Sequence, residues 1–329
     1  MQEGEDYHLF YLSREGGIGR AVSKDLIHWE QLPMILNLAK PGDWDEMGML
    51  LTGSTVKHEG RYYLSYGSKH PEPLGLLVSD DLKRWSRVGD PVLPSKAPYA
   101  QDWRDLSSYW DSQTMKWNGC LCARYDGMPC VGRVSSPDLV HWTHHEPYFI
   151  SEPYTRENNG FVEFEVPEMF EMNGKHYMVF SSIRSRKSFI SGREDASGTW
   201  YLVADRKEGP YSVPKNPLLM GTGMGRIDHY VGRTITRNSE RLMYCQNWGP
   251  YTGVNWSTPK LIQANESNEL SLHYWPELDV LKKDKLLSVA SMLVRSDADK
   301  GYRIQDIANT EISDFMLTCD LEDRKSTRL

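Results

Sequence analysis

Long apolar runs and excess positive charge are both missing from this 329-residue chain. No apolar stretch approaches the ~20 residues that a membrane-spanning helix needs, so the sequence predicts no membrane partner. The formal net charge of −7 at pH 7 argues against nucleic acid as a partner, because neutralising phosphates requires a basic face. No secretory signal is recognisable. Localisation therefore stays open, and an extracellular or periplasmic location is compatible with the sequence.

Cysteine is scarce, and its spacing matches no zinc motif. The cysteines are Cys120, Cys122, Cys130, Cys245 and Cys319. Their number is odd, and Cys120 and Cys122, two residues apart in a strand, are poorly placed to bridge each other. The sequence therefore predicts reduced, buried thiols and no metal site. Long amphipathic helical patterns are missing too, so we expect an all-β protein.

What the chain does contain is a repeated phrase, a turn followed by an aromatic-rich strand. It occurs at residues 3–11, 59–64, 118–122, 173–178 and, more loosely, 238–244. A second phrase, Asp-Leu-x-x-Trp, has its aspartates at Asp25, Asp81 and Asp138, which are 56 and 57 residues apart. Repetition of strands with a period of about fifty residues is typical of a β-propeller. Five copies predict five blades, and a residue needed once per blade should hold a turn rather than catalyse.

The repeats also predict the domain organisation. We expect blades at about 1–45, 46–104, 105–160, 161–223 and 224–262, so that the propeller occupies residues 1–262. Residues 263–329 should form a linker and the start of a C-terminal β-sandwich with a disordered tail, because so few residues cannot complete an ordinary sandwich. The strand that should precede the first turn would lie before Met1.

Used as a ruler, the repeat singles out two acids. Glu165 stands nine residues before the turn glycine Gly174, and Asp111 stands eight residues before Gly119. Both acids should therefore begin the innermost strand of their blades, close to the propeller axis. Two carboxyl groups from neighbouring blades would suit glycoside cleavage, which needs acids on either side of the scissile bond.

Several segments of residues 1–280 resemble glycoside hydrolase family 32, the β-fructosidases such as invertases, inulinases and levanases. The segment 164–170, Phe-Glu-Val-Pro-Glu-Met-Phe, is similar to the Glu-Cys-Pro-Asp-Leu-Phe segment of that family. Residues 19–29 resemble its first-blade strand, 44–54 its approach to blade two, and 227–230 its Asp-Phe-Tyr element. The resemblance implies a glycosidase that acts on oligosaccharides or polysaccharides without a cofactor.

The resemblance also implies roles. Glu165 would be the acid/base of a retaining double displacement, and Asp111 would stabilise the transition state. The family's Arg-Asp-Pro stretch reads Trp110-Asp111-Ser112 here, and Asp105, in a literal Arg104-Asp105 pair, is the alternative. The nucleophile would precede Met1, so we expect the chain as given to be inactive by itself. Substrate-binding candidates are Trp44, Asp45, Ser54, Trp110, His229, Tyr230 and Trp248.

Two other functions stay open at this point. Related five-bladed enzymes cleave arabinans or xylans with inversion, and a degenerate propeller could bind glycans without cleaving them. A carboxyl separation of about 5–5.5 Å would indicate retention, and roughly 6.5–9.5 Å inversion. The sequence leaves the sugar, the linkage, the endo or exo mode and the oligomeric state undecided.

Overall fold

The computed structural model describes residues 1–13, 16–36, 42–46, 50–68, 73–155, 160–185, 196–223, 229–249 and 253–282. The chain divides into a unit of residues 1–275 and a second unit of residues 276–329, whose described part contains one 3-10 helix, η1 (Pro276–Leu281). No helix in the described ranges is long and apolar enough to cross a membrane.

The first unit is built from five antiparallel sheets. The first has β1 (Gln2–Glu3), β2 (Asp6–Leu12), β3 (Ile18–Ser23) and β4 (Glu30–Leu36). The second has β5 (Leu50–Leu51), β6 (Thr55–His58), β7 (Arg61–Ser68), β8 (Leu74–Ser79) and β9 (Ser86–Arg87). The third has β10 (Arg104–Asp111), β11 (Lys116–Tyr125), β12 (Met128–Ser136) and β13 (Thr143–Ile150). The fourth has β14 (Glu165–Met172), β15 (Lys175–Ser185), β16 (Ala196–Ala204) and β17 (Leu218–Gly223). The fifth has β18 (Tyr230–Arg237), β19 (Glu240–Gly249), β20 (Gly253–Trp256), β21 (Lys260–Ala264) and β22 (Leu270–Tyr274).

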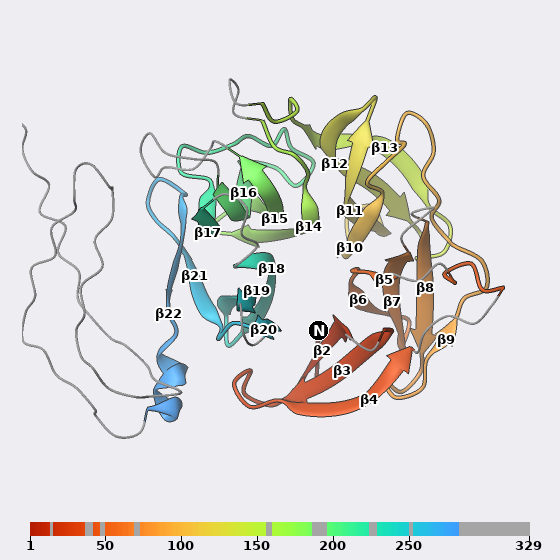
Figure 1. Cartoon of the computed structure of the whole chain (residues 1–329), viewed down its shortest axis with the longest axis horizontal. Helices are drawn as coiled ribbons and strands as arrows, with labels where there is room; N and C mark the ends of the chain where they lie inside the picture. The colour runs from red at the N-terminus through yellow and green to blue at the C-terminus, as the bar shows by residue number, and fades with distance from the viewer. Residues whose placement is uncertain are drawn as a thin grey trace, which may run out of the picture. The chain divides into compact units, whose positions relative to one another are not determined.

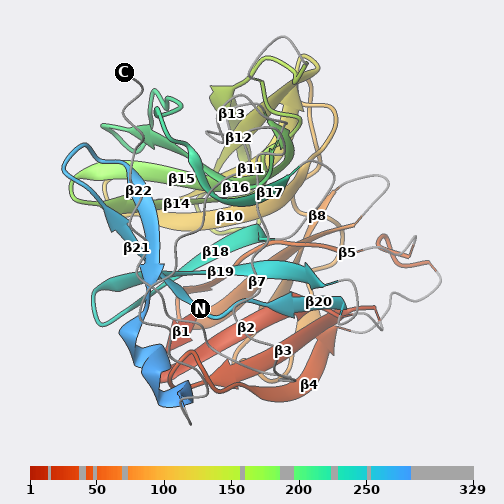
Figure 2. The same cartoon turned by 60° about the vertical axis from the view of Figure 1, so that its left-hand side comes forward.

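These sheets are the predicted five blades, and they surround a common centre in Figure 1. The first strand of each of the last three blades, β10, β14 or β18, lies at one edge of its sheet and faces that centre. The strands β10 and β14 run side by side in both Figure 1 and Figure 2. Residues at the start of these inner strands can therefore meet across neighbouring blades.

The fifth blade is longer than predicted. Its strands β21 and β22 pair from Lys260 with Tyr274 to Ala264 with Leu270, so the propeller continues past the expected boundary at residue 262. The segment 263–274 therefore contains blade strands and is not a linker to a second domain. The predicted β-sandwich falls almost wholly on residues 283–329, which lie outside the described residues.

The turn phrases hold in four of the five blades. Gly4, Gly60 and Gly174 have φ values of 59°, 80° and 72°, a left-handed backbone that glycine adopts at low cost. In blade three the expected turn is wrong, because Gly119 lies inside β11 and pairs with Val134. A Cβ there would come within 2.6 Å of the Leu106 side chain, so this glycine permits close packing.

The repeated aspartates are structural, as predicted. Asp138 Oδ1 accepts hydrogen bonds from the backbone N–H groups of Val140 and His141, at 3.0 and 2.8 Å. Asp25 and Asp81 make the same pair of bonds two and three residues further on. Each aspartate thus closes the turn between the last two strands of its blade.

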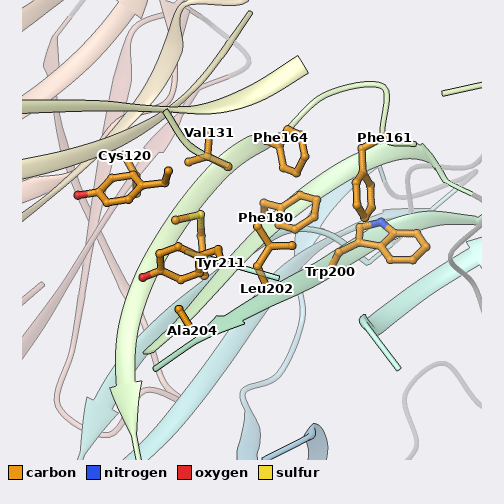
Figure 3. Close-up of a cluster of buried hydrophobic side chains, with 11 residues drawn as sticks. Cys120, Val131, Phe161, Phe164, Phe180, Trp200, Leu202, Ala204 and Tyr211 are labelled. Atoms are coloured by element: carbon orange, nitrogen blue, oxygen red, sulfur yellow. The ribbon is translucent and has the colours of Figure 1, made fainter. Parts of the chain in front are cut away.

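Apolar packing joins blade three to blade four, as Figure 3 shows. Phe164 lies fully buried between blades, with its ring centroid 4.6 Å from that of Phe180. Cys120 and Val131 reach the same cluster from blade three. This core fixes the chain at residue 164 and therefore fixes the residues on either side of it.

The thiol prediction is confirmed for the four described cysteines. Cys120, Cys122, Cys130 and Cys245 are free and buried. Burial raises the pKa of the Cys120 and Cys130 thiols to about 12, so both stay protonated at neutral pH. Cys319 lies outside the described residues.

Candidate active site

The three inner strands β10, β14 and β18 share a β-bulge near their start. In blade three the register moves from Arg104 opposite Cys122 to Ser107 opposite Cys120, three residues against two. The same shift begins at Glu165 in blade four and at Tyr230 in blade five. The residues that follow these positions have left-handed φ values: Asp105 64°, Val166 51° and Val231 56°. A bulge redirects side chains, and here it brings Arg104, Glu165 and Tyr230 together.

Glu165 lies at the centre of this group. Its Oε1 accepts a hydrogen bond from Arg104 Nη2 at 2.9 Å, which is also an ion pair. Its Oε2 accepts the hydroxyl hydrogen of Tyr230. The Glu165 side chain keeps 25% of its surface exposed, whereas the Arg104 side chain keeps 12%. The carboxyl group is therefore oriented from two sides and still open to a ligand.

Asp105 follows Arg104 in β10 and links three blades through the hydrogen bonds of its carboxyl group. Its carboxyl accepts hydrogen bonds from the Thr52 hydroxyl of blade two and, at 3.0 Å, from the backbone N–H of Val166 in blade four. Only 3% of the residue is exposed. Burial raises the pKa of Asp105, while the Arg104 guanidinium, 3.8 Å away, opposes that shift.

A second carboxyl, that of Glu163, lies beside Glu165. Its Oε1 accepts the backbone N–H of Ile183 at 2.9 Å and lies 3.5 Å from the Tyr230 hydroxyl oxygen. Burial, followed by the charge of Glu165, raises the pKa of Glu163 to about 7. Among the described residues no group of three or more His, Cys, Asp or Glu side chains could hold a metal ion.

Asp111 does not belong to this group, so its predicted placement is wrong. It ends β10, seven residues after Arg104, which at ~3.3 Å per residue puts it roughly 20 Å along the strand. Its Oδ1 pairs with Lys207 Nζ at 2.6 Å, and its carboxyl also accepts Gln113 N–H and the Thr114 hydroxyl. Asp111 thus closes a turn and ties blade three to blade four.

Three predicted substrate-binding residues instead make structural contacts within and between blades. Asp45 is fully buried, and its Oδ2 accepts Tyr66 OH at 3.1 Å and Arg87 Nη2 at 3.2 Å. The Trp44 ring packs 5.3 Å from the Tyr66 ring. Ser54 Oγ accepts the Ser108 N–H at 3.1 Å, which links blades two and three. These contacts give the three side chains structural roles, and their sugar contacts stay a prediction.

The other four candidates fall in different places. Trp110 is 38% exposed, but its ring packs against those of His58 and Trp117 beside Asp111, at the far end of β10. Tyr230 reaches Glu165, and His229 precedes it with Nδ1 3.9 Å from Cys245 Sγ. Trp248 has its backbone in β19, paired with Val254, and its side chain lies outside the described residues.

The sequence analysis does not single out Arg104 or Glu163, and it names Asp105 only as the alternative to Asp111. The literal Arg104-Asp105 pair is the available signal, but with Gly119 as the turn residue of blade three it lies six residues too early. The blade-three turn lies at residues 112–115, so Arg104 stands seven residues before the end of its strand, as Glu165 does in β14. For Glu163 the sequence offers only an acid two residues before Glu165.

Fold and site together define a five-bladed propeller with clustered carboxyl groups on its inner strands. The family described as glycosyl hydrolases family 32, N-terminal domain, matches residues 1–245. The chain therefore belongs to family 32 of the glycosyl hydrolases.

Curated relatives agree with this assignment. The chain is 27% identical to a levanase of Bacillus subtilis over 64% of its own length and 32% of the relative's length. It is 32% identical to an acid beta-fructofuranosidase of Phaseolus vulgaris over 93% of its own length and 53% of the relative's. The chain thus spans about a third to a half of these proteins.

Solved structures show the same fold. A GH32 beta-fructofuranosidase of Bombyx mori, in complex with sucrose, has a TM-score of 0.67 at 17% identity, covering 86% of this chain and 63% of that one. An exo-1,5-alpha-L-arabinanase from a bovine ruminal metagenomic library has a TM-score of 0.61 at 15% identity, covering 83% and 95%.

Proposed function

We propose that the natural protein is a glycoside hydrolase that cleaves O-glycosidic bonds of fructan-like or related oligosaccharides, with Glu165 as its acid/base. The observation that carries this proposal is the Glu165 carboxyl, oriented by Arg104 and Tyr230 and a quarter exposed at the start of an inner strand. Family membership and the names of the curated relatives, levanase and acid beta-fructofuranosidase, support the substrate class.

The proposed reaction is a retaining double displacement. A carboxylate attacks the anomeric carbon while Glu165 gives its proton to the leaving oxygen. The Glu165 carboxylate then takes a proton from water, whose oxygen bonds to the anomeric carbon as the bond to the first carboxylate breaks. From the family resemblance we propose that the attacking carboxylate belongs to the innermost strand of blade one.

We further propose that Asp105, in place of Asp111, is the second acid of this site. Its contacts with Thr52 and with the backbone of Val166 hold it at the level of Glu165. A fixed carboxylate at that level can stabilise the positive charge that develops on the sugar in the transition state.

An inverting arabinanase is the second candidate, because the match with the arabinanase structure covers 95% of the arabinanase chain. The configuration of the first-formed product separates the two mechanisms, since retention and inversion give opposite anomers. The protein, expressed as its natural gene encodes it, should be incubated with sucrose, 1-kestose, inulin, levan and arabino-oligosaccharides.

The proposal expects hydrolysis of the fructose-containing substrates with retention, abolished in Glu165→Gln. Glu171→Gln is the matched control, because Glu171 is exposed on the same strand. Hydrolysis of arabino-oligosaccharides alone with inversion would support the second candidate. Binding of the sugars without turnover would support a glycan-binding propeller.

A further inference from the structure

We propose that Glu163 stores a proton for the acid/base: as a neutral acid it directs the Tyr230 hydroxyl toward Glu165 and supplies Glu165 with a proton through that hydroxyl. The inference rests on the proposed acid/base role of Glu165. Glu163 acts through Tyr230, so it is a positioning residue and does not itself contact the substrate.

The two glutamates are held on one side of the chain by the residue between them. Phe164 is fully buried in the core shared by blades three and four, and this fixes the chain between Glu163 and Glu165. Tyr230, from β18, then contacts both carboxyl groups: it donates to Glu165 Oε2, and its oxygen lies 3.5 Å from Glu163 Oε1. The three groups form a row with the phenol in the middle.

Counting hydrogens gives the protonation state of this row. A tyrosine hydroxyl has one hydrogen to donate, and here Glu165 receives it. The Tyr230 oxygen can still accept a hydrogen bond, but a charged Glu163 has none to give, whereas a neutral Glu163 does. A contact of 3.5 Å is long for this bond, and catalytic hydrogen bonds commonly shorten when the substrate is bound.

The surroundings favour the neutral form of Glu163. Burial and the neighbouring charge of Glu165 raise the pKa of Glu163 to about 7, and Asp102 adds to that shift. The Ile183 N–H and the Arg104 guanidinium oppose it. The charged and titratable groups facing Glu163 are thus Glu165 on its own segment, Arg104 and Asp102 from blade three and Tyr230 from blade five.

The transfer balances as one proton moved between two carboxyl groups. The O–H bond of Tyr230 breaks as a new O–H bond forms on Glu165 Oε2, and the Glu163 O–H bond breaks as its proton passes to the Tyr230 oxygen. Tyr230 ends as it began, Glu163 becomes charged and Glu165 becomes neutral. Glu165 is then the neutral acid that protonates the leaving oxygen.

The test is the pH dependence of kcat/KM for Glu163→Gln in the natural protein, with Glu171→Gln, an exposed glutamate of β14, as the matched control. The glutamine amide can still donate a hydrogen bond to Tyr230, so activity at low pH should stay within about twofold of the parent. Its proton store is gone, so the alkaline limb should move from near pH 7 to lower pH by about one unit or more. Glu171→Gln should leave the profile unchanged.

An alkaline limb that stays in place in Glu163→Gln would overturn the proposal, and so would an equal loss of activity at every pH, which a purely structural role predicts. Infrared difference spectroscopy gives a reading that needs no turnover. The band of a protonated carboxyl that titrates near pH 7 should vanish in Glu163→Gln and persist in Glu171→Gln. Persistence of this band in Glu163→Gln would contradict the proposal. If the band behaves as expected but the protein hydrolyses none of the sugars, the proposed function is wrong and the protonated state of Glu163 is still supported.

Discussion

The Glu163 carboxyl group lies in surroundings that disfavour its charged form, so the free energy of unfolding should depend on pH. Its folded pKa of about 7 lies above its ordinary value of 4.5, so its contribution to stability is complete below pH 4.5 and is lost as the pH rises through 7. Glu163→Gln should therefore raise the free energy of unfolding at pH 8 by up to about 3 kcal/mol and leave it unchanged at pH 4.5. Melting temperatures of both proteins at the two pH values measure this, and an equal difference at both would contradict it.

Glu165 should matter for the rate far more than for the fold. Glu165→Ala should lower kcat on a poor leaving group by about 10²–10⁴-fold, because general acid catalysis contributes that much. The loss should shrink on an aryl glycoside whose phenolate needs no protonation. Steady-state kinetics on the two substrates give the comparison, and equal losses would remove Glu165 from the acid role.

Asp105 and Asp111 provide a direct comparison of the two candidate acids. Asp105→Asn should lower kcat/KM by about 10²–10³-fold, because it removes a carboxylate beside the developing charge. Asp111→Asn should change kcat/KM by less than about twofold, since Asp111 pairs with Lys207 at the far end of the strand. The opposite order of effects would return the second acid to Asp111.

At this scale the sequence predicted the structural aspartates and the position of Glu165 at the start of its strand, but it placed Asp111 at the wrong end of β10. The error came from Gly119, which looks like a turn residue and is needed instead for close packing against Leu106. No local pattern distinguishes a glycine that turns the chain from one that makes room for a neighbour. The contacts of Asp45 with Tyr66 and Arg87 were likewise not readable from the sequence, because they are tertiary contacts.

At the level of the element, the Asp-Leu-x-x-Trp turn should have a measurable energy. Asp138→Ala removes two hydrogen bonds to backbone N–H groups and should cost about 1 kcal/mol, since the side chain is partly exposed. Asp138→Asn keeps an oxygen for both bonds and should cost less than half as much. Thermal unfolding of the two variants checks this, and equal losses would mean that the ion pair with His141 holds the turn.

The strands were readable because alternating apolar residues and turn glycines repeat along the chain. The bulges were not, because Asp105 differs in chemistry from Val166 and Val231, and a valine gives no sequence signal for a left-handed backbone. A bulge is set by the register between two strands, and that register depends on partners far along the sequence. The same bulge decides which residues meet at the site, so the site was less predictable than the fold.

For the whole molecule, closure of the ring between blades five and one depends on side chains. Tyr244 OH donates to the Leu26 carbonyl, and Arg237 donates to the Lys24 carbonyl at 2.9 Å. Tyr244→Phe should cost about 1 kcal/mol and speed hydrogen exchange in β2 and β3 more than in β11. Tyr125→Phe, which loses a bond to exposed Glu146 within blade three, is the control. Equal exchange in all three strands would argue against a local role in closure.

The number of blades followed from the sequence because each blade repeats one pattern. The end of the propeller did not, because β21 and β22 lack the Asp-Leu-x-x-Trp phrase that marks the outer turn of the first three blades. Their place in the fifth sheet is set by the pairing of β21 with β19 and of β22 with β21, which the local sequence does not encode.

The shared bulge also bears on how such a site can evolve. The residues that open it in three successive blades are a cation, an acid and a phenol, Arg104, Glu165 and Tyr230. Backbone pairing between strands fixes each of these positions. A single codon change can therefore replace one of the three side chains while the backbone at the other two positions stays unchanged. A lineage can then explore new sugars one blade at a time.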